Sequence, residues 1–244
     1  MNGNIAFILL IIGVILVSGC ASKPQVNDTV SPSNATTTQP ASNEISMIAA
    51  TIKSPLSEEG VAALGKLATI GTEESVQVLL DKVVILDEFK GKNIDESGLI
   101  AIFAQIENSE ATAILVNKLK AKTTNDEFLV PGIARALGNI GNKEATDTLI
   151  EFAQKAYDQQ ADYATVQQEY YFAIERSKDL SSLMVAAKNN KLFWEIRARA
   201  LKAIGGIAKT DVLSDLEKIR DDPTTYIEVQ RAADQAMTRI SRGY

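Results

Sequence analysis

The sequence contains no histidine, one cysteine and one tryptophan among 244 residues. The missing histidine removes the general base on which nucleophilic catalysis normally depends, and no histidine–cysteine cluster can hold zinc. A single cysteine excludes an intrachain disulfide. Acidic residues outnumber basic ones by 31 to 25, which argues against nucleic-acid binding because that function needs a basic surface. We therefore expect a protein that is not an enzyme and that uses no cofactor or metal.

The first 19 residues have the pattern of a signal peptide. An almost unbroken apolar run from Ile5 to Val17 has the length of a signal hydrophobic region and is short for a membrane span. The run ends in Val17-Ser18-Gly19-Cys20, which resembles a prokaryotic lipobox and implies lipid on Cys20 after cleavage. The start of the chain departs from the pattern because it has no Lys or Arg. The alternative is an uncleaved N-terminal anchor, and either reading predicts a membrane-anchored, extracytoplasmic protein of the cell envelope.

Residues 20–43 are predicted to be a disordered tether. They are rich in Ser, Thr, Asn and Pro and have hardly any large apolar side chain, so they cannot bury enough surface to offset chain entropy. Asn27 and Asn34 each begin an Asn-x-Thr triplet, which is a possible glycosylation site. Such triplets also arise by chance in a Thr-rich segment.

Residues 44–244 are predicted to form a repeat domain. Isoleucines recur every 33–36 residues, an apolar or aromatic residue stands three positions before each, and a leucine stands nine positions after each of the first five. A fixed period of this size marks a stacked-repeat protein. The isoleucines are Ile70, Ile106, Ile140, Ile174, Ile207 and Ile240; the residues before them are Leu67, Phe103, Leu137, Tyr171, Ile204 and Met237; the leucines are Leu79, Leu115, Leu149, Leu183 and Leu216.

Each copy is predicted to be a helical hairpin. In the third copy Ile133, Leu137 and Ile140 form one apolar stripe, Gly141 ends the helix in a left-handed conformation, and Asn142 caps the next helix. Stacking of such hairpins buries a continuous core. The predicted hairpins are 57–70 with 73–86, 95–107 with 110–121, 127–140 with 143–157, 162–175 with 179–189, and 193–207 with 211–221. A helix at 44–53 should cap the first repeat, and a last helix at 224–241 should follow an Asp222-Pro223 cap.

The phrase Ala136-Leu137-Gly138-Asn139-Ile140-Gly141 resembles HEAT repeats, of the short HEAT-like kind first noted in phycobilin lyases. The resemblance covers about residues 56–241 and implies an all-α superhelix of about five hairpins with a C-terminal capping helix. Tetratricopeptide repeats share the period but have a longer first helix, so they rank second. The family includes scaffolds, adaptors and lyase subunits. We therefore expect a lipid-anchored envelope scaffold that binds a protein or peptide; the alternatives are an accessory subunit related to phycobilin lyases and a structural envelope protein without a dedicated ligand.

The resemblance also implies that partners bind along the second helices of the repeats. The residues eleven positions after the isoleucines are candidates, with an ordinary solvated helix face as the alternative. Trp194, in the apolar triplet Leu192-Phe193-Trp194, could be an exposed anchor for a partner or could pack between repeats four and five. The residues eleven positions after the isoleucines are Asp81, Asn117, Glu151, Val185 and Lys218. The residues seven positions after them, which are candidates for the same surface, are Gln77, Ala113, Asp147, Ser181 and Ser214.

Overall fold

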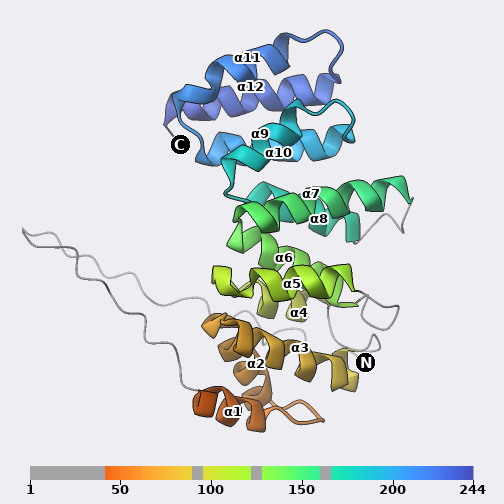
Figure 1. Ribbon diagram of the computed structural model, residues 1–244, viewed down its shortest axis with the longest axis vertical. Helices are drawn as coiled ribbons and strands as arrows, with labels where there is room; N and C mark the ends of the chain where they lie inside the picture. The colour runs from red at the N-terminus through yellow and green to blue at the C-terminus, as the bar shows by residue number, and fades with distance from the viewer. Residues whose placement is uncertain (1–41, 90–95, 122–127, 160–165, 244) are drawn as a thin grey trace, which may run out of the picture. The chain divides into compact units, whose positions relative to one another are not determined.

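The computed structural model describes residues 42–89, 96–121, 128–159 and 166–243 (Figure 1). In these ranges the secondary structure consists of twelve α-helices and short 3-10 turns, without a strand. None of the described helices is both long enough and apolar enough to cross a membrane. The predicted all-α class is confirmed.

The helices form five hairpins between a first and a last single helix. The first helix, α1 (Ser42–Thr51), precedes repeat one, and α12 (Ile227–Arg242) follows repeat five. The five repeats are α2 (Glu58–Ile70) with α3 (Glu73–Ile85), α4 (Glu96–Phe103) with α5 (Thr112–Lys120), α6 (Val130–Ile140) with α7 (Lys143–Asp158), α8 (Val166–Arg176) with α9 (Leu180–Lys188), and α10 (Trp194–Ile207) with α11 (Leu213–Asp221).

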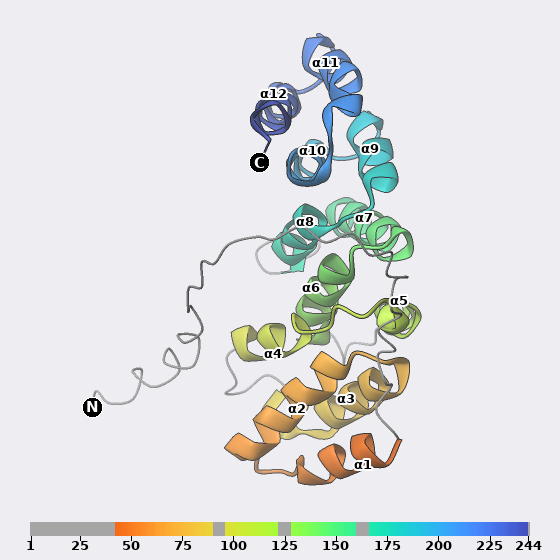
Figure 2. The ribbon, with the colours of Figure 1, turned by 90° about the vertical axis from the view of Figure 1, so that its left-hand side faces the viewer.

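The repeats stack in two layers. The first helices α2, α4, α6, α8 and α10 pack in sequence with α12 at the end, and the second helices α3, α5, α7 and α9 pack in the same order on the other side. Figure 2 shows the two layers edge-on, with α11 continuing the second layer. Because each hairpin covers the apolar face of the next, the array has the architecture predicted for a HEAT-like solenoid.

The column of leucines is the centre of the core. All five leucines that stand nine positions after the isoleucines have no exposed surface, at 0% each. The isoleucine column is buried less regularly, since Ile207 is 40% exposed. The leucine column, which repeats without exception, is therefore the better marker of the fold.

Glycine and capping residues set the turns as predicted. Gly141 ends α6 with φ of 62°, in the left-handed region that favours glycine, and Gly71 does the same for α2 with φ of 64°. Asn142 caps α7, since its Oδ1 accepts a hydrogen bond from the backbone N–H of Ala145 at 2.9 Å. The local sequence of the central hairpin therefore specifies both its turn and the start of its second helix.

Several predicted helix boundaries differ from the structure. Helix α4 ends at Phe103 rather than residue 107, and α12 begins at Ile227 rather than 224. Asp222 does not cap α12: its Oδ1 accepts from the backbone N–H of Thr224 at 2.8 Å, within a turn that precedes the helix. An Asp side chain that bonds its own backbone two residues on stabilises a turn instead of a helix start.

Two glycines allow adjacent first helices to approach closely. A Cβ added to Gly138 of α6 would lie 2.6 Å from the carbonyl oxygen of Ala173 in α8. A Cβ added to Gly205 of α10 would lie 2.8 Å from the Cα of Ala236 in α12. Both glycines stand two positions before the repeat isoleucine, so this column controls how tightly the first-helix layer packs.

Candidate partner-binding face

The two candidate columns lie exposed on the second helices. Every member, from Gln77 and Asp81 on α3 to Ser214 and Lys218 on α11, is exposed, and Val185 of α9 reaches 67%. We call this surface the second-helix face. Beneath each pair of exposed positions lies a fully buried leucine of the core column. The structure thus places Asp81, Asn117, Glu151 and Lys218 on one layer, with their side chains exposed.

In repeats three to five, three carboxylates on the second helices are neutralised by lysines of the same chain. Lys143 Nζ lies 2.6 Å from Asp147 Oδ2, and Lys155 Nζ lies 2.5 Å from Glu151 Oε1. Lys188 Nζ of α9 lies 2.7 Å from Asp215 Oδ2 of α11. These pairs are largely solvated, so each contributes little to stability.

The pKa values of the paired groups follow from these contacts. The hydrogen bond from Lys188, and then its charge, lower the pKa of Asp215 below its ordinary value. Burial acts to raise the pKa of Asp147, but the hydrogen bond and the charge of Lys143 act against it and leave this pKa lowered. The carboxylates of Asp147 and Asp215 are therefore held in their charged form by their own neighbours.

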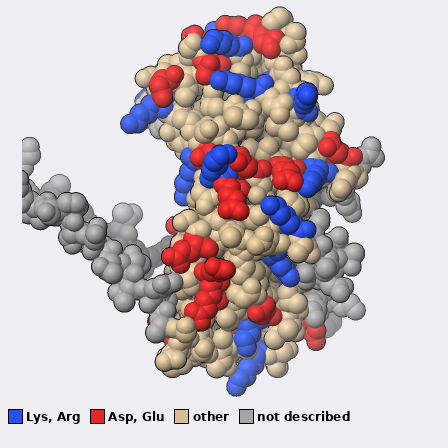
Figure 3. All heavy atoms as spheres, viewed as in Figure 1, with Lys and Arg blue, Asp and Glu red and all other residues tan. Residues whose placement is uncertain are grey.

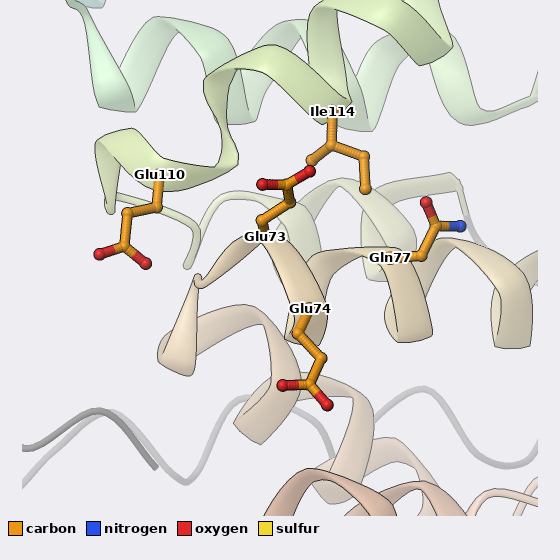
Figure 4. A pocket seen from close by; sticks show the side chains of 5 residues that line it. All are labelled: Glu73, Glu74, Gln77, Glu110 and Ile114. Carbon is orange, nitrogen blue, oxygen red and sulfur yellow. The ribbon is translucent and has the colours of Figure 1, made fainter. Parts of the chain in front are cut away.

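Repeats one and two differ, because their carboxylates surround an open groove. The groove lies between α3 and α5, has a volume of about 620 Å³, and is lined by Glu73, Glu74, Gln77, Glu110 and Ile114. Figure 3 shows acidic side chains gathered over the N-terminal ends of these two helices. In Figure 4 the side chains of Glu73 and Ile114 lie close together between the two helices, and Glu74 points toward α1.

The groove carboxylates have no cation from the described part of the chain. Glu74 accepts a hydrogen bond from Ser42 Oγ at 3.0 Å, whereas Glu73 and Glu110 form no ion pair among the described residues. Their position in the first turn of their helices is favourable, because the N-terminal end of a helix carries partial positive charge. This helix-end effect explains why they are tolerated. It leaves the groove with a net negative charge.

Trp194 lies where repeat five meets repeats three and four. It is half-buried at the start of α10, and its ring lies 5.4 Å from that of Phe193. Phe193 stacks on Tyr157 of α7 with ring centroids 3.9 Å apart, and its backbone N–H donates to Gln154 Oε1 at 2.8 Å. Phe193 thus joins repeat five to repeat three. Trp194, which is partly exposed, lines a shallow hollow beside α12.

Two features of the first-helix layer were not found in the sequence. Phe172 of α8 is 40% exposed, and its ring lies between the guanidinium groups of Arg135 at 5.6 Å and Arg199 at 5.7 Å. Phe172 occupies the column in which the other repeats have Ala or Gly, and this exception was the available signal. A hollow of about 640 Å³ between α1, α2 and α4 is lined by apolar residues such as Val61 and Ile102, which the column pattern did not indicate.

The remaining candidates cannot be placed. Cys20, Asn27 and Asn34 lie outside the described residues, as do the whole predicted signal peptide and almost all of the tether. Within the described ranges, no group of three or more Cys, Asp or Glu residues is arranged to hold a metal ion. Lipidation, glycosylation and cell-envelope location therefore stay predictions.

Comparison with known proteins identifies the repeat class. The PBS lyase HEAT-like repeat family matches residues 132–155, which span α6, its turn and most of α7. The chain is therefore a HEAT-repeat protein, as its sequence pattern predicted. No curated protein matches the chain. The solved structure of human deoxyhypusine hydroxylase in complex with glycerol is similar at 13% identity and a TM-score of 0.32, over 82% of this chain and 96% of that one.

The prediction that the protein is not an enzyme requires correction. Deoxyhypusine hydroxylase is an enzyme by its name, so one of the proteins similar to this chain is an enzyme. At this identity and TM-score the likeness assigns no activity here. What is withdrawn is the exclusion itself, which rested on the missing histidine.

Proposed function

We propose that the protein is a lipid-anchored scaffold of the cell envelope that holds a protein or peptide partner on its second-helix face. The observation that carries this proposal is that each second helix has one buried position that stabilises the fold and exposed positions that differ between repeats. A fully buried leucine fixes the fold, while the positions that differ between repeats, two residues before and two after it, are exposed. Repeat arrays use such continuous surfaces for binding.

The groove between α3 and α5 supports a partner that presents basic side chains. Its carboxylates lack a cation within the described chain, unlike Asp147, Glu151 and Asp215. Complementary charge would orient such a partner and speed its association. Ile114 supplies an apolar contact at the same place.

Site-specific photo-crosslinking in intact membranes tests the partner surface. A photoreactive residue at Asn117 of α5 should yield a protein adduct, whereas one at Lys66 of α2, exposed on the first-helix layer, should not. An adduct from Lys66 alone would place the interaction on the other layer and refute the proposed face.

A charge reversal tests the acidic groove with a closely matched control. Glu73→Lys changes the first residue of α3, and Glu58→Lys changes the first residue of α2; both glutamates are exposed. Each change removes a favourable interaction between a glutamate and the N-terminal end of its helix. The two variants therefore differ in which layer of helices carries the change. We expect Glu73→Lys to reduce the Asn117 adduct and Glu58→Lys to leave it unchanged.

The anchor is tested separately at Cys20. Labelled fatty acid should be incorporated into the wild-type protein and not into Cys20→Ser, which should also lose its tight membrane association. Continued lipid labelling of the variant would show that the lipobox is misread. This result is independent of the crosslinking result, so the two halves of the proposal can fail separately.

An accessory role of the lyase kind is the second candidate. The observation that favours it is the match of residues 132–155 to the PBS lyase HEAT-like repeat. Such a role would require the chain or its partner to carry a chromophore or another modified group. Absorption spectra and mass spectrometry of the complex captured through Asn117 distinguish this role from simple scaffolding.

A further inference from the structure

Hydrogen bonds from two neighbouring repeats converge on the side chain of Asn139, in the last turn of α6. Asn139 Nδ2 donates to the carbonyl oxygen of Ala104, in repeat two, at 2.6 Å. Arg176 Nη1, in repeat four, donates to Asn139 Oδ1 at 3.1 Å. Asn139 itself is only 9% exposed. One short amide therefore joins the repeats on both sides of its own.

The backbone around Asn139 is bonded to repeat four as well. Lys178 Nζ donates to the carbonyl oxygen of Asn139 at 2.8 Å. The backbone N–H of Lys178 donates to the carbonyl oxygen of Gly141 at 3.1 Å. Carbonyls at the end of a helix have no partner within the helix and carry partial negative charge, so a lysine at this place satisfies and neutralises them.

The chemistry requires an amide at this position. A donor toward Ala104 and an acceptor toward Arg176 must come from one side chain, and asparagine has both on a short arm. The same column holds Gln105 in repeat two, whose Oε1 accepts from Thr69 Oγ1 of repeat one at 3.1 Å. The column continues with Ala173 and Gly206, which have no polar side chain.

The contact between repeats four and five has a different character. Glu175 of α8 pairs with Arg199 and Lys202 of α10, and the Lys202 side chain is 49% exposed. The Lys202 pair is weakened by salt and contributes little, whereas the side chains of Arg199 and Glu175 are only 22% and 15% exposed. Polar side chains thus join successive repeats along the turns as far as repeat four. Repeats four and five are joined instead by these ion pairs and by the buried Arg197 of α10, whose Nε donates to the carbonyl oxygen of Ala187 in α9 at 3.0 Å.

We propose that Asn139 is a clamp that makes repeats two, three and four open and close as one cooperative unit. In a stacked array, stability is the sum of each repeat and its interfaces with its neighbours, so a side chain that bonds in both directions strengthens two interfaces together. This unit holds Asn117 and Glu151 of the second-helix face at a fixed spacing. The proposal concerns folding cooperativity and stands whether or not that face binds a partner.

Hydrogen exchange measured by mass spectrometry on the full chain tests the clamp. In Asn139→Ala, exchange should rise about 5- to 30-fold in α4, α6 and α8 together, the change expected when one hydrogen bond is lost and its partners are left unpaired. Exchange in α12 should not change. Asn117→Ala is the matched control, because this exposed asparagine makes no side-chain hydrogen bond to another repeat.

A second variant separates the two arms of the amide. Arg176→Met removes the hydrogen bond that the Asn139 side chain accepts from repeat four and keeps the bond to Ala104. Arg176 is exposed, so the fold tolerates the change. We expect faster exchange in α8 with α4 unaffected. A rise confined to α6 in Asn139→Ala, or an equal rise in α12, would overturn the clamp.

Discussion

Leu149→Ala offers the most direct test of how the array is held together. Leu149 lies in the second helix of the central repeat, has 0% exposure, and belongs to the leucine column. Helix α7 is packed against α5, α6, α8 and α9, so the surroundings cannot collapse into the space that the substitution leaves. Removal of a buried leucine side chain costs about 2–5 kcal/mol, with the larger values at sites that relax least.

The same substitution at Leu216 provides a comparison within the column. Leu216 is also 0% exposed, but α11 lies in the terminal repeat and has fewer neighbours that resist movement. We therefore expect Leu149→Ala to cost more than Leu216→Ala, against a total stability of about 5–15 kcal/mol. Asn117→Ala, on the surface, should stay within about 0.5 kcal/mol of wild type.

Urea unfolding followed by circular dichroism at 222 nm measures all three variants. A cost below about 1 kcal/mol for Leu149→Ala would contradict the role of the leucine column as the core. A larger loss at Leu216 than at Leu149 would contradict the argument from confinement. Substantial strand content in the wild-type spectrum would refute the fold.

Further predictions concern glycine, charge and pH. Gly138→Ala should destabilise the protein by about 1–3 kcal/mol, since its Cβ would meet the Ala173 backbone, whereas Gly206→Ala, with nothing within 4 Å, should be neutral or stabilise α10 by up to about 1 kcal/mol; thermal melting compares them. Asp215 has a pKa lowered by Lys188, so its contribution is present above its ordinary value of 3.8 and is lost as the pH falls through the lowered pKa. Asp215→Asn should therefore show a smaller fall in urea midpoint than wild type when the pH is lowered through this range.

Sequence reasoning succeeded where a residue type has one structural meaning. The leucines nine positions after each isoleucine are all buried, and Gly141 adopts the left-handed conformation that its place in the phrase implied. These are local or strictly periodic constraints, so one copy of the repeat predicts the next. The exposed positions of the second helices followed from the same register.

Features that depend on contact between repeats were not predictable in the same way. Asp222 could cap a helix or bond its own turn, and only the packing of α12 decides between them. Phe172 breaks a column of small residues, but its place between Arg135 and Arg199 depends on the distance between three helices. The double role of Asn139 likewise needs the positions of both neighbours.

The separation of buried leucines from exposed columns has a consequence for how such a protein can change. Ten positions, two on each second helix, can be substituted with little effect on stability, because surface changes usually cost within about 0.5 kcal/mol. Recognition can thus diverge from copy to copy while the leucine beneath each pair keeps the repeats in register. A library randomised at these ten positions would explore new binding specificities without redesign of the fold.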